Sequence, residues 1–138
     1  MIIQHLNWLA VAVSAIAYFA LGAIWFNPKI FGTMWMKGHG ITPTEEDKKN
    51  MGKMMATTLV LCFIGAITAG YFCYALNSWD WMRGAKIGLI AGCGFTGVGI
   101  AMNYMYSKKS FTLIIIDSSY HVVGMIIAGI IMSVWRYS

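Results

Sequence analysis

Charged residues are almost absent from four long stretches of this chain, and this pattern limits the folds it can adopt. A transmembrane α-helix needs about 20 consecutive, mostly apolar residues, and each stretch meets that length. Only 11% of the residues are charged, whereas soluble domains carry about 25%. We therefore predict an all-α fold, a four-transmembrane-helix bundle in one integral membrane domain (1–138), with helices at about 6–26, 54–76, 84–106 and 111–134.

The basic residues predict how these helices are oriented. Seven of the ten lysines and arginines fall in the loop 27–53 and in the short connection before the last helix. Because Lys and Arg in short loops favour the cytoplasmic side, we expect a multi-pass protein of the cell inner membrane with both termini outside the cytoplasm. The lipid bilayer is then a partner. The net charge of +5 flanks the apolar stretches and does not indicate nucleic-acid binding.

The long loop carries signals for further helical structure. Asn27-Pro28 is expected to end the first helix, because proline disfavours helical geometry in the residue before it. Apolar residues spaced along 29–37 predict a short interfacial helix between the first two membrane helices. Thr42 is then expected to be the N-cap of the next helix, with Glu45 completing a capping box.

Small residues form stripes on the last two predicted helices. Several glycines of the third stretch are spaced by four residues, a pattern that lets helix backbones approach closely in lipid. The residues expected at helix packing contacts are Gly84, Gly88, Gly92, Gly99, Gly124 and Ala128. Gly65 and Ala69 give the second predicted helix such a face as well. Small-residue faces on three helices exceed what one internal seam requires, so we expect a homo-oligomer.

Asp117 and His121 are the most informative polar residues, because they interrupt the last apolar stretch. An ionisable side chain costs at least about 2.5–3.5 kcal/mol at the centre of a membrane helix. Four residues apart, the two lie on one helical face. A short connection joins the last two helices and favours an antiparallel hairpin. Its register is expected to place Asn103 opposite Asp117, and Gly99 opposite His121.

Two interpretations of these residues stay open. In the first, Asp117, His121 and Asn103 form a binding or proton-relay site on the cytoplasmic half of an oligomeric transporter, channel or ligand-binding protein. A small ion or polar ligand would bind there. In the second, the same residues only lock helix packing in a structural or accessory membrane subunit.

No pattern indicates a metal site, a cofactor or an enzyme. Cys62, Cys73 and Cys93 lie in apolar stretches without paired spacing, so they are expected to be small buried side chains. Haem is disfavoured because only His121 among the three histidines lies deep in an apolar stretch. No nucleophile or carboxylate pair suggests catalysis.

Two segments resemble a known family pattern. The first is Trp25-Phe26-Asn27-Pro28 with Phe31-Gly32 and Trp35, and the second is Asp117-Ser118-Ser119-Tyr120-His121. Together they resemble domain-of-unknown-function family 1761, small four-helix membrane proteins of bacteria. The resemblance spans nearly the whole chain and implies the same architecture. It assigns no activity, but it singles out the Asp–His pair and adds Tyr120 beside it as a candidate site residue.

Overall fold

The computed structural model describes residues 1–136, and every regular element in that part of the chain is helical. By length and composition, four spans can cross a membrane: Trp8–Trp25, Glu45–Ala75, Trp81–Tyr106 and Phe111–Val134. The predicted all-α fold with four transmembrane helices is therefore confirmed. In chain order the elements are η1 (Ile2–His5), α1 (Trp8–Trp25), η2 (Pro28–Gly32), α2 (Thr33–His39), α3 (Glu45–Ala75), α4 (Trp81–Ala91), η3 (Gly92–Gly97), α5 (Val98–Tyr106) and α6 (Phe111–Val134).

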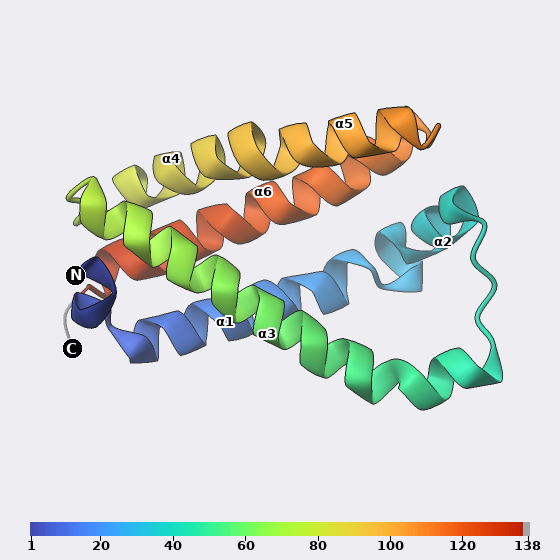
Figure 1. The fold of residues 1–138 in the computed structure, drawn as a ribbon, viewed down its shortest axis with the longest axis horizontal. Helices are drawn as coiled ribbons and strands as arrows, with labels where there is room; N and C mark the ends of the chain where they lie inside the picture. The colour runs from blue at the N-terminus through green and yellow to red at the C-terminus, as the bar shows by residue number, and fades with distance from the viewer. Residues whose placement is uncertain (137–138) are drawn as a thin grey trace.

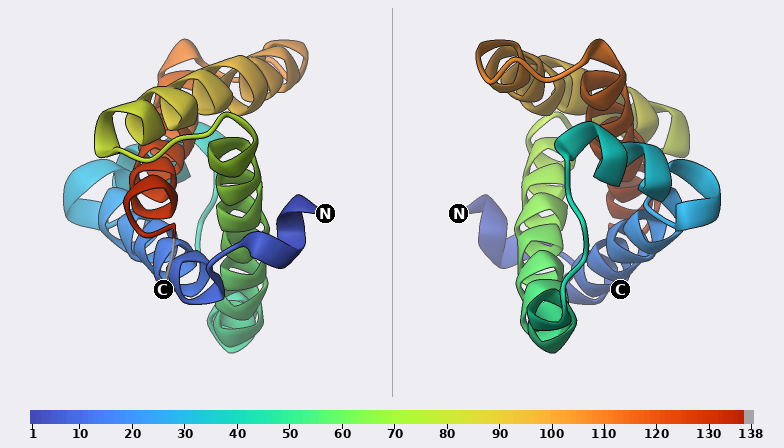
Figure 2. Two further views of the ribbon diagram at one scale, coloured as in Figure 1. Left: turned by 90° about the vertical axis from the view of Figure 1, so that its left-hand side faces the viewer. Right: turned by 90° about the vertical axis from the view of Figure 1, so that its right-hand side faces the viewer.

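α6 is the central helix of the bundle (Figure 1). It packs against α1 on one side and against α4 and η3 on the other. α3 crosses α1 and also contacts α6, but it makes far less contact with α4. The end-on views in Figure 2 show α3 standing beside the other three spans. α3 is therefore only loosely joined to the third span, and the candidate site lies where they separate.

The seam between α4 and α6 depends on glycine. A Cβ atom on Gly84 would overlap the carbonyl of Gly129, and one on Gly88 would overlap another α6 carbonyl. A Cβ on Gly92 would lie 2.8 Å from the Cα of Val122. Any larger residue at these positions would push the helices apart, so the glycines permit the close backbone approach typical of membrane helices.

The third span is not a continuous α-helix. Between α4 and α5 it makes the π-helical turn η3, which holds more residues per turn than an α-helix. Residues after this turn therefore lie on different faces of the span from those predicted with a period of 3.6 residues. Gly99 has no atom within 4 Å of its Cβ position, so its expected place on the α6 seam opposite His121 is wrong. Cys93, expected to be buried, is exposed, whereas Cys62 and Cys73 are buried.

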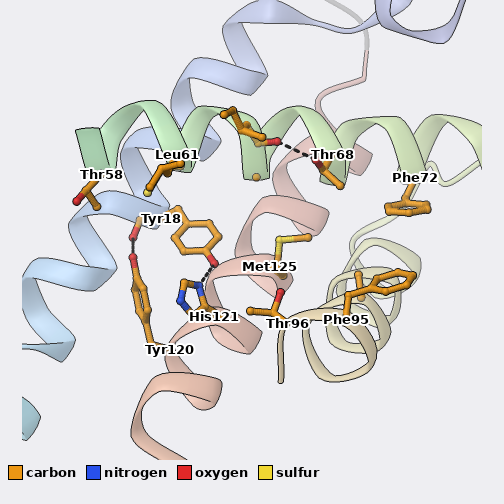
Figure 3. Close-up of a pocket in the computed structure, with 14 residues that line it drawn as sticks. Tyr18, Thr58, Leu61, Thr68, Phe72, Phe95, Thr96, Tyr120, His121 and Met125 are labelled. Carbon is orange, nitrogen blue, oxygen red and sulfur yellow. Dashed lines mark hydrogen bonds between the residues drawn. The ribbon is translucent and has the colours of Figure 1, made fainter. Parts of the chain in front are cut away.

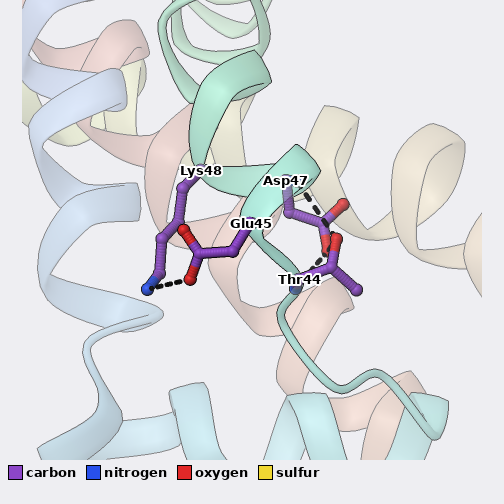
Figure 4. Close-up of polar contacts among 4 residues, drawn as sticks. All are labelled: Thr44, Glu45, Asp47 and Lys48. Atoms are coloured by element: carbon purple, nitrogen blue, oxygen red, sulfur yellow. Dashed lines mark hydrogen bonds and ion pairs between the residues drawn. The ribbon is translucent and has the colours of Figure 1, made fainter.

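The connection between α1 and α3 lies across one end of the bundle as η2 and α2 (Figure 2). α2 ends at His39 and is capped by Gly40, whose φ of 66° suits glycine, and an extended segment leads to α3 (Figure 1). α3 begins at Glu45, so the end of the predicted loop 27–53 is helical. Its N-cap is Thr44, not Thr42: the Thr44 and Asp47 side chains form the capping box (Figure 4). This box satisfies N–H groups at the helix start.

η1 and the C-terminal end of α6 lie at one end of the bundle, and α2 lies at the other (Figure 1). At the end with η1, the Arg136 guanidinium donates to the carbonyls of Tyr74 and Ser78, at 3.3 and 3.2 Å. It also lies over the rings of Tyr74 and Trp79, 4.2 and 4.1 Å from the ring centroids. This cation thus donates to one carbonyl in the last turn of α3 and to one in the connection that follows it.

Candidate functional site

The polar residues of α6 divide between two places in the structure. His121 faces α1, where its Nδ1 lies 2.6 Å from the hydroxyl of Tyr18. Asp117, one turn earlier, faces the third span and α2. The two residues therefore share a helix but contact different partners.

Tyr18 is held firmly in place by α6. A Cβ on Gly124 would lie 2.7 Å from the Tyr18 ring, so the absence of a side chain there makes room for it. The ring of Tyr120 meets the Tyr18 ring edge to face, with centroids 5.4 Å apart. The Tyr120 hydroxyl donates to the Tyr18 backbone carbonyl at 3.3 Å. Packing and hydrogen bonding together fix the orientation of the Tyr18 hydroxyl toward His121.

His121 and Tyr18 line a cavity of about 400 Å³ between α3 and the other spans (Figure 3). We call this cavity the lateral groove. Its α3 wall faces residues of η3 and α6, as Figure 3 shows, and the rings of Phe72 and Phe95 stack 6.2 Å apart across it. It is lined by Tyr18, Thr58, Leu61, Cys62, Ile64, Gly65, Thr68, Phe72, Ala91, Phe95, Thr96, Tyr120, His121 and Met125.

The lining is apolar except for a few groups. The hydroxyls of Thr58 and Thr68 donate to carbonyls of their own helix, at 2.8 and 2.9 Å, which leaves them little capacity to donate elsewhere. None of the lining residues is Asp, Glu, Lys or Arg. Within the described chain, neither Nε2 of His121 nor the Thr96 hydroxyl has a hydrogen-bond partner, and these two groups are the polar atoms available to a ligand.

Asp117 belongs to a second cluster, outside the groove. The Tyr104 hydroxyl donates to its Oδ2 at 2.5 Å, and Nε2 of His39 lies 3.6 Å from the same oxygen. Asn103 is exposed, and among the described residues its side chain makes no hydrogen bond to Asp117, so the predicted pairing of these two residues is wrong. The π-helical turn advances the register by about one residue and presents Tyr104 instead.

His39 reaches Asp117 because α2 docks on the start of α6. A Cβ on Gly38 would lie 2.7 Å from Leu113, so the two helices touch at this glycine. The His39 ring packs against Tyr104 and against Trp35, with centroids 5.6 and 4.6 Å apart. The side chain of Asp117 is only 9% exposed. Its carboxylate therefore links α2, α5 and α6.

Aromatic rings connect the two clusters. Phe26 packs against Trp35 of α2 and against Tyr120 of α6, with centroid distances of 5.6 and 5.2 Å. Trp25 donates from its indole to the carbonyl of Ile116 at 3.0 Å. The aromatic turn after α1 thus ties the docked α2 to the helix that carries the groove residues.

Three contacting residues were not predicted from the sequence. Tyr18 is the only hydroxyl-bearing aromatic residue of the first apolar stretch, and this could have marked it as a candidate. His39 and Tyr104 gave no comparable signal, because their contacts depend on the folded loop and on the π-helical turn. Among the described residues, no group of three His, Cys, Asp or Glu side chains could hold a metal ion.

The family comparison agrees with this architecture. Residues 9–133 match the model of a family described as a protein of unknown function, DUF1761. No curated protein and no solved structure matches the chain significantly. The match covers all four apolar spans apart from their outermost residues. The chain therefore belongs to the DUF1761 family.

Proposed function

We propose that this protein binds a lipophilic small molecule taken from the bilayer, in the lateral groove. The observation that carries the proposal is a cavity of about 400 Å³ with apolar walls and one uncommitted imidazole nitrogen. Ligand sites typically occupy about 300–1,000 Å³ and combine apolar walls with few polar groups. Of the three activities expected from the sequence, this geometry favours ligand binding over a channel or a transporter.

The groove opens toward the surface that would face lipid. Its rim residues Leu61, Ile64 and Phe95 are 60%, 55% and 71% exposed. α3 and the third span separate here, and the π-helical turn η3 forms one edge. Such turns are frequent at functional sites. A ligand would enter sideways from the membrane rather than along the bundle axis.

The expected polar site is divided in this proposal. His121, Tyr18 and Tyr120 belong to the groove, whereas Asp117 locks helices together through Tyr104 and His39. The second function expected from the sequence, a structural or accessory subunit, is favoured by this Asp117 cluster alone. We propose that both roles are present on the same helix.

Filling the groove tests the proposal. A Cβ on Gly65 would meet only the Tyr18 ring, at 3.7 Å, so Gly65→Leu extends into the groove without a backbone clash. Gly52→Leu on the same helix is the matched control, because Gly52 has no atom within 4 Å of its Cβ position and does not line the groove. Both variants add the same side chain to α3.

The measurement is the thermal unfolding midpoint in detergent, with and without a long-chain methyl ketone. A ligand that binds only the folded state stabilises it, by about 2.7 kcal/mol at 100 times its dissociation constant. We expect the ketone to stabilise the wild type and Gly52→Leu but not Gly65→Leu. Equal stabilisation of all three proteins would place binding elsewhere.

The cellular setting is also a proposal. η1 and the C-terminal end of α6 lie at the same end of the bundle, which suits an even number of crossings. The basic loop and the turn between α5 and α6 would then face the cytoplasm, as expected for an inner-membrane protein. Reporter fusions to each terminus test the orientation. The expected homo-oligomer is tested by native mass spectrometry in detergent.

A further inference from the structure

The hydrogen bond between Tyr18 and His121 determines which imidazole nitrogen carries a proton. The Tyr18 side chain is buried, and Nδ1 of His121 is the one hydrogen-bond partner of its hydroxyl in the described part of the chain. If Nδ1 carried the proton, the hydroxyl hydrogen would have no acceptor, and an unmade buried hydrogen bond is costly. The hydroxyl therefore donates to Nδ1, and the proton of a neutral imidazole resides on Nε2.

The Nε2–H group is thus an unused donor on the wall of an apolar groove. His121 is only partly buried, and its Nε2 is not among the described polar atoms that are both fully buried and unpaired, so this nitrogen is accessible from the groove. His121 lines the groove beside Thr96 and opposite α3 (Figure 3). In lipid, no water is present to satisfy such a donor. A ligand with an acceptor oxygen would satisfy it.

The charge of the lining restricts the ligand further. No acidic or basic side chain lines the groove, so an ionised head group would lose its hydration without gaining a counter-ion. A neutral molecule avoids that penalty. The apolar walls suit a hydrocarbon chain or ring.

We propose that the ligand is a neutral lipophile that presents a carbonyl oxygen to Nε2–H of His121, with its apolar part along the α3 wall of the lateral groove. This inference rests on the proposed function and specifies its ligand class. Tyr18 acts as a positioning residue, because it holds the imidazole in the donor tautomer and makes no ligand contact through its hydroxyl.

The test compares a long-chain methyl ketone with the alkane of the same length, using the full chain reconstituted in ether-linked lipid that contains no carbonyl group. The ketone carries an isotope label at its carbonyl. We expect the ketone to bind about two- to tenfold more tightly than the alkane, the worth of one neutral hydrogen bond. The labelled infrared carbonyl band is expected to shift to lower frequency on binding.

His121→Phe removes the donor and keeps a ring of similar size. It is expected to abolish both the preference for the ketone and the band shift, while the alkane still binds. Since this variant could fail to fold, the wild type supplies a second measurement. The Nε2–H resonance of nitrogen-labelled histidine should move on addition of the ketone and not on addition of the alkane.

The outcomes separate the two proposals. Equal binding of ketone and alkane to the wild type, with no band shift, would overturn the carbonyl assignment and keep the groove as a binding site, provided that Gly65→Leu blocks both. Tighter binding of a long-chain carboxylate or ammonium than of the ketone would also overturn it. If Gly65→Leu binds both probes as the wild type does, the groove is not the site and both proposals fail.

Discussion

Replacing Gly88 with alanine tests the glycine seam between α4 and α6. The added Cβ would overlap the Met125 carbonyl and would lie 2.6 Å from the Cα of Ile126. Non-bonded carbon atoms prefer about 3.5–4.0 Å, so the helices must separate by roughly 1 Å. Overpacking of this kind costs about 1–3 kcal/mol. The same change gains up to about 1 kcal/mol of helix propensity.

Gly99→Ala isolates the packing cost. Gly99 lies on the same span and has no atom within 4 Å of its Cβ position, so this variant gains helix propensity without a clash. The free energies of unfolding of the two variants should differ by about 1–3 kcal/mol, measured by denaturant titration or steric trapping in micelles. Identical free energies for Gly88→Ala and Gly99→Ala would refute the seam.

Three further predictions concern the helix ties. Tyr104→Phe should lower the free energy of unfolding by about 1–2 kcal/mol, because the hydrogen bond to Asp117 is lost. Asn103→Leu should change the free energy of unfolding by less than about 0.5 kcal/mol. A larger loss for Asn103→Leu than for Tyr104→Phe would show that Asn103, not Tyr104, is the partner of Asp117. Gly38→Ala should undock α2 and speed hydrogen exchange over 33–39, and unchanged exchange would contradict that docking. Arg136→Met should cost about 1–3 kcal/mol, because the Ser78 carbonyl loses its donor and the Tyr74 carbonyl keeps only the Asn77 N–H, and wild-type stability would argue against a role for these Arg136 contacts.

The membrane helices could be predicted because their signal is local. A run of apolar residues fixes the span whatever its neighbours are, and α6 begins and ends at the predicted residues 111 and 134. The start of α3 was harder to predict from the sequence. Thr42 and Thr44 both precede acidic residues, and only the folded chain shows that Thr44 is the cap.

The candidate site was less predictable because it depends on geometry between helices. The Asp117–His121 spacing predicted one shared helical face, whereas the structure directs the two side chains to different partners. Their partners could not be predicted, since one π-helical turn replaced Asn103 with Tyr104. His39 was assigned to a loop, and its approach to Asp117 requires α2 to dock on the start of α6. The groove depends on how far α3 diverges from η3, which no sequence pattern encodes.

Photochemical mapping of bound lipophile is the most direct test of the lateral groove. A diazirine-bearing long-chain ketone would be photolysed in proteoliposomes, and adducts located by mass spectrometry. We predict adducts concentrated on groove residues such as Leu61, Thr68 and Phe95, and lost in Gly65→Leu but kept in Gly52→Leu. Ile90 is 70% exposed on the same span as Phe95 and does not line the groove. Labelling of Ile90 as strong as that of the groove residues would contradict the account.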